Sequence, residues 1–544
     1  MNDGGRISAL PWKSDPISKE TLEDVLRLPQ GTMELRPIQV EACSEILRQQ
    51  GLFGPIAVGA GKTLICALAP TLLEAERPML FTRAQLREQM REDIELLREH
   101  WYIKNNIRVH GYSELSLAKN ADMLEDYKPD AIICDEAHRV LRRTSARTRR
   151  LWRYFTKTNP DCKMVAVSGT MTTKSIEDYW KLLYLSLDMK APIPLDYIVR
   201  QSVATCVDPN PRNWPSRRDW DASKKLYLGY DPEPNKGSMR QQIRRGFRHR
   251  LINSEGVVSS DKAEVGASLT VIEHQIDPPK VVQECVQNLR DTWTDPAGNE
   301  LNSILEFHRV IRQLSIGFFY EWVWPNGIAD KRWLRARNAW AKYVRNRLSL
   351  NKQGEDSPLL VYNATAALDN PPQVFWDWVR EKHKKQPPVR AVWISDYAIQ
   401  YALKWASKQD KPAIIWYSHK AIGEVLSEKL PTYGSGDMPP KEPADPVVAM
   451  SIIAHGEGRN LQPWNTGFVL EPPSNAKVWE QLLGRTHRPG TKFDEIYWHY
   501  LVPIQEVAEG MEKAHGQAAY IESTFGSKQK LLYADNARVG SRTR

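Results

Sequence analysis

The chain has 544 residues, of which 41% are hydrophobic and 26% are charged, proportions that are ordinary for a soluble globular protein. That length is enough for about three domains with large cores. No apolar run is long enough to cross a bilayer, so we expect no membrane segment. The formal net charge of +9 favours a polyanionic partner, although a basic surplus that serves only solubility explains the charge equally well.

The cysteines are scattered along the chain and form no C-x-x-C pair. They are Cys43, Cys66, Cys134, Cys162, Cys206 and Cys285. This spacing argues against a zinc site or a disulfide framework and favours a reducing compartment. The first residues also lack the apolar stretch of a signal peptide, so we expect a cytoplasmic protein. Many of the 19 tryptophans belong in cores, and some could stack on bases.

Residues 1–30 form a polar lead-in, after which Leu35-Arg36-Pro37-Ile38-Gln39 opens a predicted helix over 40–50. The Gln39 amide could read the edge of an adenine through its paired donor and acceptor. A lone glutamine on a helix is ordinarily exposed to solvent, and this residue alone carries little weight.

The stretch Ile56-Ala57-Val58-Gly59-Ala60-Gly61-Lys62-Thr63 predicts a phosphate-binding loop. Its glycines let the backbone curl so that N–H groups approach an anion, and the helix predicted from residue 64 would point its N-terminus at the phosphates. Lys62 could reach the terminal phosphates and Thr63 could ligate Mg²⁺. The strict pattern G-x-x-x-x-G-K-[ST] fails at Ile56, and a Gly-rich turn with an unrelated lysine is the alternative.

A second half of the site follows the apolar run 131–134, which predicts a buried parallel strand. It ends in Asp135-Glu136-Ala137-His138, which delivers two carboxylates to the carboxyl edge of a sheet. Asp135 could hold Mg²⁺ and Glu136 could orient the attacking water. An acidic pair in this position is otherwise a helix N-cap. Together with the loop at 59–63, it predicts an ATP site.

Further strands are predicted at 79–82, 107–110 and 164–167, and the last one ends in Ser168-Gly169-Thr170. A helix beginning near residue 84 carries Gln89, and an arginine cluster fills 142–153. Because strands alternate with helices, the pattern predicts a doubly wound parallel sheet.

Residues 186–390 are rich in proline, tryptophan and arginine, and helices are predicted at 239–250, 281–293 and 301–324. We interpret this region as a helical insertion with a linker. The aromatic residues there (Trp322, Trp324, Trp333 and Trp340) could supply a stacking wedge, although helix packing is the commoner role.

The α/β alternation returns from 391. Strands are predicted at 413–418, 447–453, 467–471 and 496–502, with helices at 421–429 and 477–483. Arg485 and Arg488 are three residues apart, so they could present two positive charges on one face. The expected organisation is a lead-in at 1–30, a first lobe at 31–185, the insertion at 186–390, a second lobe at 391–505 and a polar, basic tail at 506–544.

The ordered motifs resemble those of superfamily two helicases and translocases. Leu35 to Gln39 looks like the adenine-sensing motif, Gly59 to Thr63 like motif I, Asp135 to His138 like motif II in its DEAH form, Ser168 to Thr170 like motif III, Gly456 to Leu461 like motif V and Gln481 to Arg488 like motif VI. Within the superfamily, residues 31–505 are most similar to the Swi/Snf-type DNA-dependent ATPases, in the short form that bacteriophages encode.

Weaker similarities support the Swi/Snf type. They are the arginine run before Leu251, the stretch Ile311-Arg312-Gln313-Leu314 and the ending Arg488-Pro489-Gly490. Ile56 departs from the strict phosphate loop, and the short region 430–450 indicates a trimmed second lobe. No chromatin-reader module is visible, so the resemblance does not imply nucleosome remodelling.

The resemblance implies two RecA-like lobes of the P-loop NTPase fold and assigns roles to residues in each. The catalytic residues would be Lys62, Asp135, Glu136, Gln481 and the arginine fingers Arg485 and Arg488. The residues in contact with ATP would be Arg36, Gln39, Gly59, Ala60, Gly61, Lys62, Thr63 and Gly458, and Thr63 and Asp135 would hold Mg²⁺. Hydrolysis would be coupled to movement by His138, Ser168, Gly169 and Thr170. Nucleic-acid contacts are expected at Arg83, Gln89, Tyr112, Ser113, Ser418 and His419.

The leading hypothesis is an ATP-dependent DNA helicase or translocase, with replication or recombination proteins as candidate partners, in the host cytoplasm if the gene is phage-encoded. An RNA helicase of the same superfamily is a second hypothesis, since DEAH motifs also occur there. A third is a non-motor ATP switch that closes on ATP to bind a protein partner. The arginine clusters at 142–153 and 240–250 fit either phosphate contacts or internal salt bridges.

Overall fold

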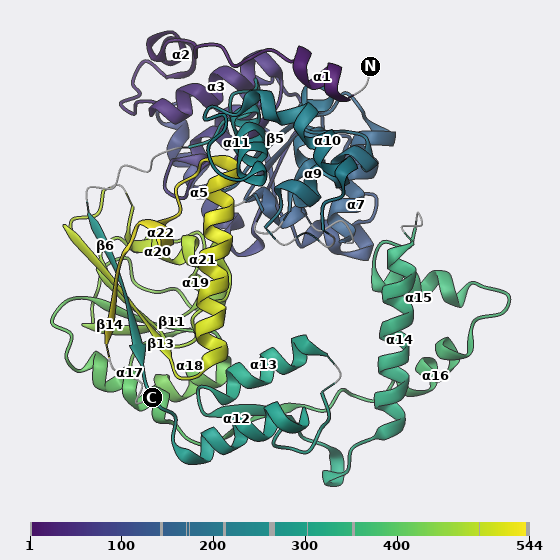
Figure 1. The fold of residues 1–544 in the computed structure, drawn as a ribbon, viewed down its shortest axis with the longest axis vertical. Helices are drawn as coiled ribbons and strands as arrows, with labels where there is room; N and C mark the ends of the chain where they lie inside the picture. The colour runs from purple at the N-terminus through teal and green to yellow at the C-terminus, as the bar shows by residue number, and fades with distance from the viewer. Residues whose placement is uncertain are drawn as a thin grey trace. The chain divides into compact units, whose positions relative to one another are not determined.

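A computed structural model of the chain describes residues 3–141, 145–169, 171–172, 175–209, 211, 214–260, 267–301, 303–350, 354–488 and 490–539 (Figure 1). The chain folds as two compact units. The first contains Met1–Ala263, Ala336–Arg380 and Tyr520–Lys528, and the second contains Glu264–Arg335, Glu381–Ala519 and Gln529–Arg544. The division falls inside helices α14 (Lys331–Ser349) and α21 (Gln505–Phe525), each of which is one continuous helix.

The first unit is built on a parallel sheet in the order β1-β5-β4-β2-β3, counted over the described residues. Its strands are β1 (Leu52–Gly54), β2 (Pro78–Thr82), β3 (Arg108–Gly111), β4 (Ala131–Asp135) and β5 (Lys163–Val167). All residues of β1, β2 and β4 are buried, as expected for parallel strands covered by helices on both faces. The doubly wound α/β lobe predicted from the sequence is confirmed.

Helices of the first unit cover this sheet and supply its core. Those nearest the predicted site are α3 (Pro37–Gln49), α4 (Lys62–Leu72), α5 (Arg87–Arg98), α7 (Ala146–Arg153) and α8 (Trp180–Leu187). Helix α4 is apolar nearly all round, and Ile65 to Ala69 are completely buried. This burial holds the N-terminal end of α4, which begins at Lys62, against the sheet.

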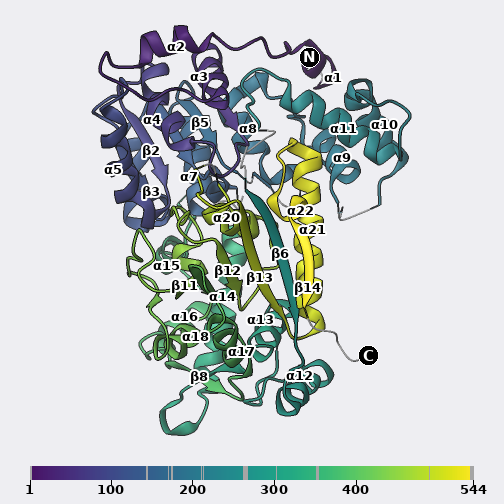
Figure 2. The same ribbon diagram turned by 90° about the vertical axis from the view of Figure 1, so that its left-hand side faces the viewer.

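The second unit also contains a parallel sheet, in the order β10-β11-β9-β12-β13-β6-β14 within the described ranges. Its strands are β6 (Ser268–Gln275), β9 (Ala413–Tyr417), β10 (Thr432–Tyr433), β11 (Val447–Ser451), β12 (Thr466–Val469), β13 (Glu495–Val502) and β14 (Asp535–Val539). Figure 2 shows β12, β13, β6 and β14 side by side. The second doubly wound lobe is therefore confirmed as a fold.

Two boundaries of the predicted lobes differ from the structure. Strand β6 lies in the predicted helical insertion, yet it pairs with β13 along its whole length, from Ser268–Glu495 to Gln275–Val502. The predicted polar tail instead forms helix α21, a short helix α22 (Lys530–Tyr533) and strand β14, which pairs with β6. Leu269 and Val271 alternate with less buried residues, so one face of β6 is buried, and this period-two pattern is typical of a strand rather than of the predicted helical insertion.

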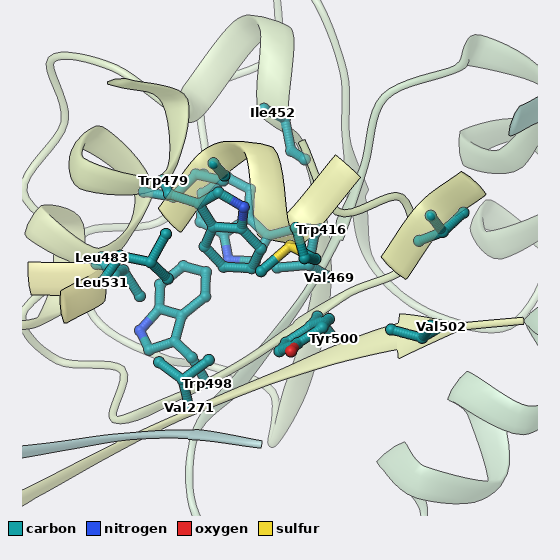
Figure 3. Packing of buried hydrophobic residues seen from close by; sticks show 14 of the residues in the cluster. Val271, Trp416, Ile452, Val469, Trp479, Leu483, Trp498, Tyr500, Val502 and Leu531 are labelled. Carbon is teal, nitrogen blue, oxygen red and sulfur yellow. The ribbon is translucent and has the colours of Figure 1, made fainter. Parts of the chain in front are cut away.

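Tryptophans form much of the second unit's core. Trp416 on β9 stacks on Trp498 of β13 with 6.0 Å between ring centroids, and Trp479 of helix α20 (Ala476–Thr486) packs on Tyr500 (Figure 3). These aromatic rings are buried, so most of their apolar area is removed from water. The expectation that many tryptophans belong to cores is confirmed.

The region 301–324, predicted as one helix, divides into two elements. Helix α13 (Ile304–Leu314) ends before Gly317, whose φ of 103° favours glycine, and strand β7 (Phe318–Trp322) follows. Strand β7 pairs in antiparallel fashion with β8 (Val389–Trp393). The run Phe318-Phe319-Tyr320 has high strand propensity, which outweighs the helical pattern before it.

The described part of the segment between β7 and β8 contains three α-helices. These are α14, α15 (Pro358–Ala366) and α16 (Gln373–Glu381), which pack through a small core of Trp340, Val344, Val361 and Phe375. Among the described residues, no helix is both long and apolar enough to cross a membrane. All six cysteines are free thiols.

Candidate nucleotide site

The loop at 59–63 has the backbone geometry that its glycines were expected to give. Gly59 and Gly61 have φ of 89° and 80°, in the left-handed region, and helix α4 begins directly at Lys62. The Lys62 ammonium donates to the carbonyl oxygens of Ile56 and Ala57, at 3.3 Å each. Ile56 is completely buried, so the residue that departs from the strict motif serves as part of the core beneath the loop.

Arg36 and Gln39 lie against the same loop. The Arg36 guanidinium donates to the Gly59 carbonyl at 2.9 Å, and the Gln39 amide donates to the Gly61 carbonyl at 3.1 Å. The oxygen of that amide accepts from the Arg36 backbone N–H. Gln39 is buried rather than solvent-exposed, and it contacts the loop directly, which the sequence alone did not establish.

The two carboxylates lie at the carboxyl end of β4, as predicted. Asp135 is buried, and its carboxylate accepts from the Thr82 hydroxyl at 3.1 Å. Glu136 has a φ of 51°, an uncommon backbone for a residue with a side chain, and one of its oxygens lies 3.8 Å from the Lys62 ammonium. Burial, and then the neighbouring Glu136, raise the pKa of Asp135.

Glu136, His138 and Ser168 form a compact polar triangle. Nδ1 of His138 lies 2.8 Å from the Ser168 hydroxyl and 3.2 Å from a Glu136 oxygen, and that hydroxyl donates to Glu136 at 3.1 Å. Gly169 lies against the loop, since an added Cβ would meet a Val58 side-chain carbon at 3.2 Å. The structure thus brings the acidic pair, the segment after β5 and the phosphate loop together. Thr170 lies outside the described residues.

The donors at this edge fit a hard divalent cation. Thr63 is half-buried in the first turn of α4, and the buried carboxylate of Asp135 stands beside a second carboxylate. Oxygen donors of this type suit Mg²⁺. A nearby cation would also favour the ionised form of Asp135 and so oppose the effect of its burial.

The residues that resemble motifs V and VI lie in the second unit. Arg485 is buried in the last turn of α20, where its guanidinium donates to the carbonyl oxygens of Gln481 at 2.8 Å and Arg459 at 2.9 Å. Gly458 has a φ of 84° beside Arg459. Helix α20 ends at Thr486, so Arg488 lies beyond the helix, and of the helical or turn face expected for the two arginines the helical one does not form. Pro489 lies outside the described residues.

Tyr112 contradicts its expected role as a nucleic-acid contact. Its ring is buried against Phe81, and its hydroxyl donates to the Asp135 carbonyl at 2.7 Å. Ser113, next to it, is exposed, whereas Arg83 and Gln89 are half-buried. The aromatic ring of Tyr112 therefore supports the strand that carries the acidic pair.

Ser418 and His419 in the second unit are organised by Glu471. Both backbone N–H groups donate to one Glu471 oxygen, at 2.8 and 3.2 Å, and the His419 ring contacts the other. Gln313 of α13 lies 3.5 Å from the far side of that ring, and Arg312 donates to the Pro472 carbonyl. The stretch 311–314 thus packs beside the carboxyl ends of β9 and β12.

Two arginine clusters serve the interior of the first unit. In α7, Arg149 donates to backbone carbonyls, and Arg150 and Arg153 pair with Asp356 and Glu125. In helix α11 (Met239–Ile252), Arg240 and Arg244 donate to backbone carbonyls, Arg245 pairs with Asp231, and Arg250 donates to the carbonyl oxygens of Ile7 and Leu10. Arg142 and Arg143 lie outside the described residues.

A comparison with protein families agrees with this geometry. Residues 32–173 match the family described as type III restriction enzyme, res subunit. This range begins before Arg36 and ends after Gly169, so it contains the whole nucleotide site of the first unit. It indicates a helicase-like P-loop domain of superfamily two, a class that hydrolyses ATP. No curated protein matches the chain.

Three residues that contribute to these sites were not predicted from the sequence. Thr82 ends β2 beside β4, so a polar residue at the end of a neighbouring parallel strand was the available signal. Glu471 closely follows the end of β12, and the same argument applies to it. Arg459 contacts Arg485 only through its backbone carbonyl, an interaction that leaves no signal in the sequence.

Proposed function

We propose that the protein is an ATP-dependent DNA helicase or translocase of the Swi/Snf type, resembling the short forms that bacteriophages encode. The observation that carries this proposal is the position of Glu136, which lies beside the Lys62 ammonium and within hydrogen-bond distance of Ser168. A carboxylate in contact with both the phosphate loop and the segment after β5 can take part in ATP hydrolysis and couple it to a change in that segment.

Each candidate-site residue of the first unit then has a defined role. The backbone N–H groups of 59–63 and the Lys62 ammonium bind the phosphates of ATP, and Arg36 and Gln39 hold the loop from the side. Thr63 and Asp135 would hold Mg²⁺, which neutralises charge on the phosphate oxygens when it is bound. Glu136 orients the attacking water and accepts its proton.

Residues of the second unit would complete the reaction. We assign Arg485 and Arg488 as arginine fingers for the charge that develops on the transferred phosphoryl group, with Gln481 and Gly458 supporting them. His138, Ser168, Gly169 and Thr170 would couple hydrolysis to movement of one lobe relative to the other.

Two features favour DNA over RNA. The stretch Ile311 to Leu314, which resembles a Swi/Snf segment, packs on His419, one of the residues proposed to contact nucleic acid. The description of the matched family also names a restriction enzyme subunit. Arg83, Gln89, Ser113, Ser418 and His419 are the proposed contacts, and replication or recombination proteins are candidate partners.

Steady-state ATP hydrolysis, measured without nucleic acid and with duplex DNA, single-stranded DNA or RNA, tests this function. We expect the largest stimulation with duplex DNA, and no activity in Glu136→Gln under any condition. Stimulation by RNA alone would replace DNA with RNA as the substrate. Hydrolysis that no nucleic acid affects would favour an ATP switch that binds a protein.

A further inference from the structure

Helix α14 differs from the other arginine-rich helices in how it uses its positive charges. In α7 and α11, the arginines discussed above pair with carboxylates or donate to backbone carbonyls. Helix α14 carries Lys331, Arg332, Arg335, Arg337, Lys342, Arg345 and Arg347, and no acidic residue stands anywhere along it. Helices α7 and α11 also lack acidic residues, so the difference lies in the partners that other parts of the fold supply.

The helix is strongly two-sided. Trp333, Ala336, Trp340 and Val344 recur every three or four residues and are buried at 3–8% exposure. Trp333 packs on Trp322 and Trp324, whereas Trp340 contacts Tyr362 of α15 and Phe375 of α16. The aromatic residues considered as a stacking wedge thus bury much of their surface against one another.

The opposite face is exposed and cationic. Lys331, Arg332, Arg335, Lys342 and Arg345 are all exposed, and the described residues include no carboxylate within 4.0 Å of any of them. Arg345 donates to the carbonyl of Ala341 in its own helix. We call these five residues the cationic face of α14.

We propose that the cationic face of α14 binds the phosphate backbone of duplex DNA. This inference rests on the proposed function and adds a contact surface that none of the helicase motifs contains. Arg345 lies fourteen positions after Lys331, so the charges extend over about 21 Å at about 1.5 Å per residue. Duplex DNA carries one charge per about 1.7 Å of its axis, so a helix of this length can contact several phosphates.

The chemistry of the face favours a phosphate backbone over other anionic partners. A membrane-bound helix inserts an exposed apolar face, but the apolar face of α14 is buried in the protein. Between the charges stand Asn338, Ala339, Ala341 and Asn346, all exposed, and none of them is a large apolar anchor for a protein interface. Charge without such an anchor suits contacts that do not depend on base sequence.

The end of α14 is also fixed to the unit that holds the nucleotide site. Arg347 pairs with Glu355, and Arg149 of α7 donates to the carbonyl oxygens of Leu348 and Glu355. Helix α7 follows the acidic pair closely in the chain. Lys342 and Arg345 of the cationic face therefore belong to the unit that binds ATP, whereas Lys331, Arg332 and Arg335 belong to the second unit.

The test measures affinity for a fluorescent DNA duplex as a function of salt concentration, without nucleotide. The variant combines Arg332→Gln, Arg335→Gln and Lys342→Gln, and a control combines Arg217→Gln, Lys280→Gln and Lys404→Gln, exposed residues on other helices. The two proteins lose equal charge. We expect the slope of log affinity against log salt to fall by about 2–3 in the α14 variant only, with an affinity loss of roughly 100-fold.

Every outcome decides the proposal. An unchanged slope in the α14 variant, or an equal fall in both proteins, would overturn it. A loss of RNA binding with normal duplex binding would also overturn it, because the partner would then be RNA. Stimulation of the wild-type ATPase by DNA is measured separately, so the proposed function can stand while the role of α14 fails. A wild-type protein that binds no duplex would overturn both.

Discussion

Arg150 and Asp356, which are separated by 206 positions in the chain, form a buried two-point ion pair. The guanidinium donates to both carboxylate oxygens at 2.9 Å, and the side chains are 1% and 7% exposed. Arg150 lies in α7, shortly after the acidic pair, and Asp356 immediately precedes the cap of α15. The pair fastens the segment at 336–380 to the helicase-like domain.

Breaking this ion pair should release that segment. Removal of one partner leaves a buried charge, which costs about 3–5 kcal/mol. We expect Asp356→Asn to increase hydrogen exchange in α15 and α16 while the parallel sheet stays protected. The combined variant Arg150→Met with Asp356→Leu leaves no charge behind and should restore much of the protection. Equal exchange in the wild-type and single-variant proteins would contradict this account.

Lys62→Ala should lower the turnover of ATP by about 10³-fold or more, because it removes a cation that stabilises the transferred phosphoryl group. Initial rates of phosphate release measure the effect. Lys104→Ala is a suitable control, since its ammonium donates to the Ala75 carbonyl, beyond the opposite end of α4 from the phosphate loop. Retained turnover in Lys62→Ala and in Glu136→Gln would end the assignment of the site.

Ser168→Ala should lower the DNA-stimulated rate of ATP hydrolysis more than it lowers the stability of the protein. The variant loses the hydroxyl that contacts both His138 and Glu136. We expect the DNA-stimulated rate to fall by about tenfold, equivalent to about 1.4 kcal/mol of transition-state stabilisation. Ser223→Ala removes another buried hydroxyl of the first unit and should leave the rate unchanged. If both variants keep full stimulation, Ser168 has no coupling role.

The second unit should lose stability in mild acid because of a buried histidine pair. Nε2 of His274 on β6 lies 2.8 Å from Nδ1 of His499 on β13, and Tyr401 contacts the other nitrogen of His274. Burial lowers the pKa of His274 to about 4 and that of His499 to about 3. The unfolded chain takes up these protons near the ordinary histidine pKa of about 6.5, whereas the folded chain resists protonation.

The pair therefore contributes its full stability above that ordinary value, and the contribution falls as the pH drops toward the two lowered pKa values. Urea unfolding followed by tryptophan fluorescence at several pH values measures this loss. His499→Phe removes one titrating group and should flatten the pH dependence. An unfolding midpoint that does not change with pH in this range would show that the pair is not responsible.

The local sequence was sufficient to predict a site residue wherever its motif adjoins the helix or strand that positions it. The glycines at 59 and 61 require the left-handed backbone that the loop adopts, and a buried apolar strand leads directly into Asp135. Strand β6 was missed because its period-two pattern lies in a polar, proline-rich region that suggested helices and a linker. Tyr112 was misjudged because a tyrosine in a turn has the same sequence signature whether its ring faces solvent or a strand.

The α/β class, the phosphate loop and the acidic pair could be predicted because each depends on residues that are neighbours in the chain. Which charges remain available to a partner depends on contacts between distant parts of the chain. The arginines of α7, α11 and α14 look alike in sequence, but most of those in α7 and α11 meet carboxylates and carbonyls from other parts of the fold, whereas most of those in α14 are exposed. Whether a guanidinium is neutralised depends on contacts within a few ångströms, and the fold alone creates those contacts.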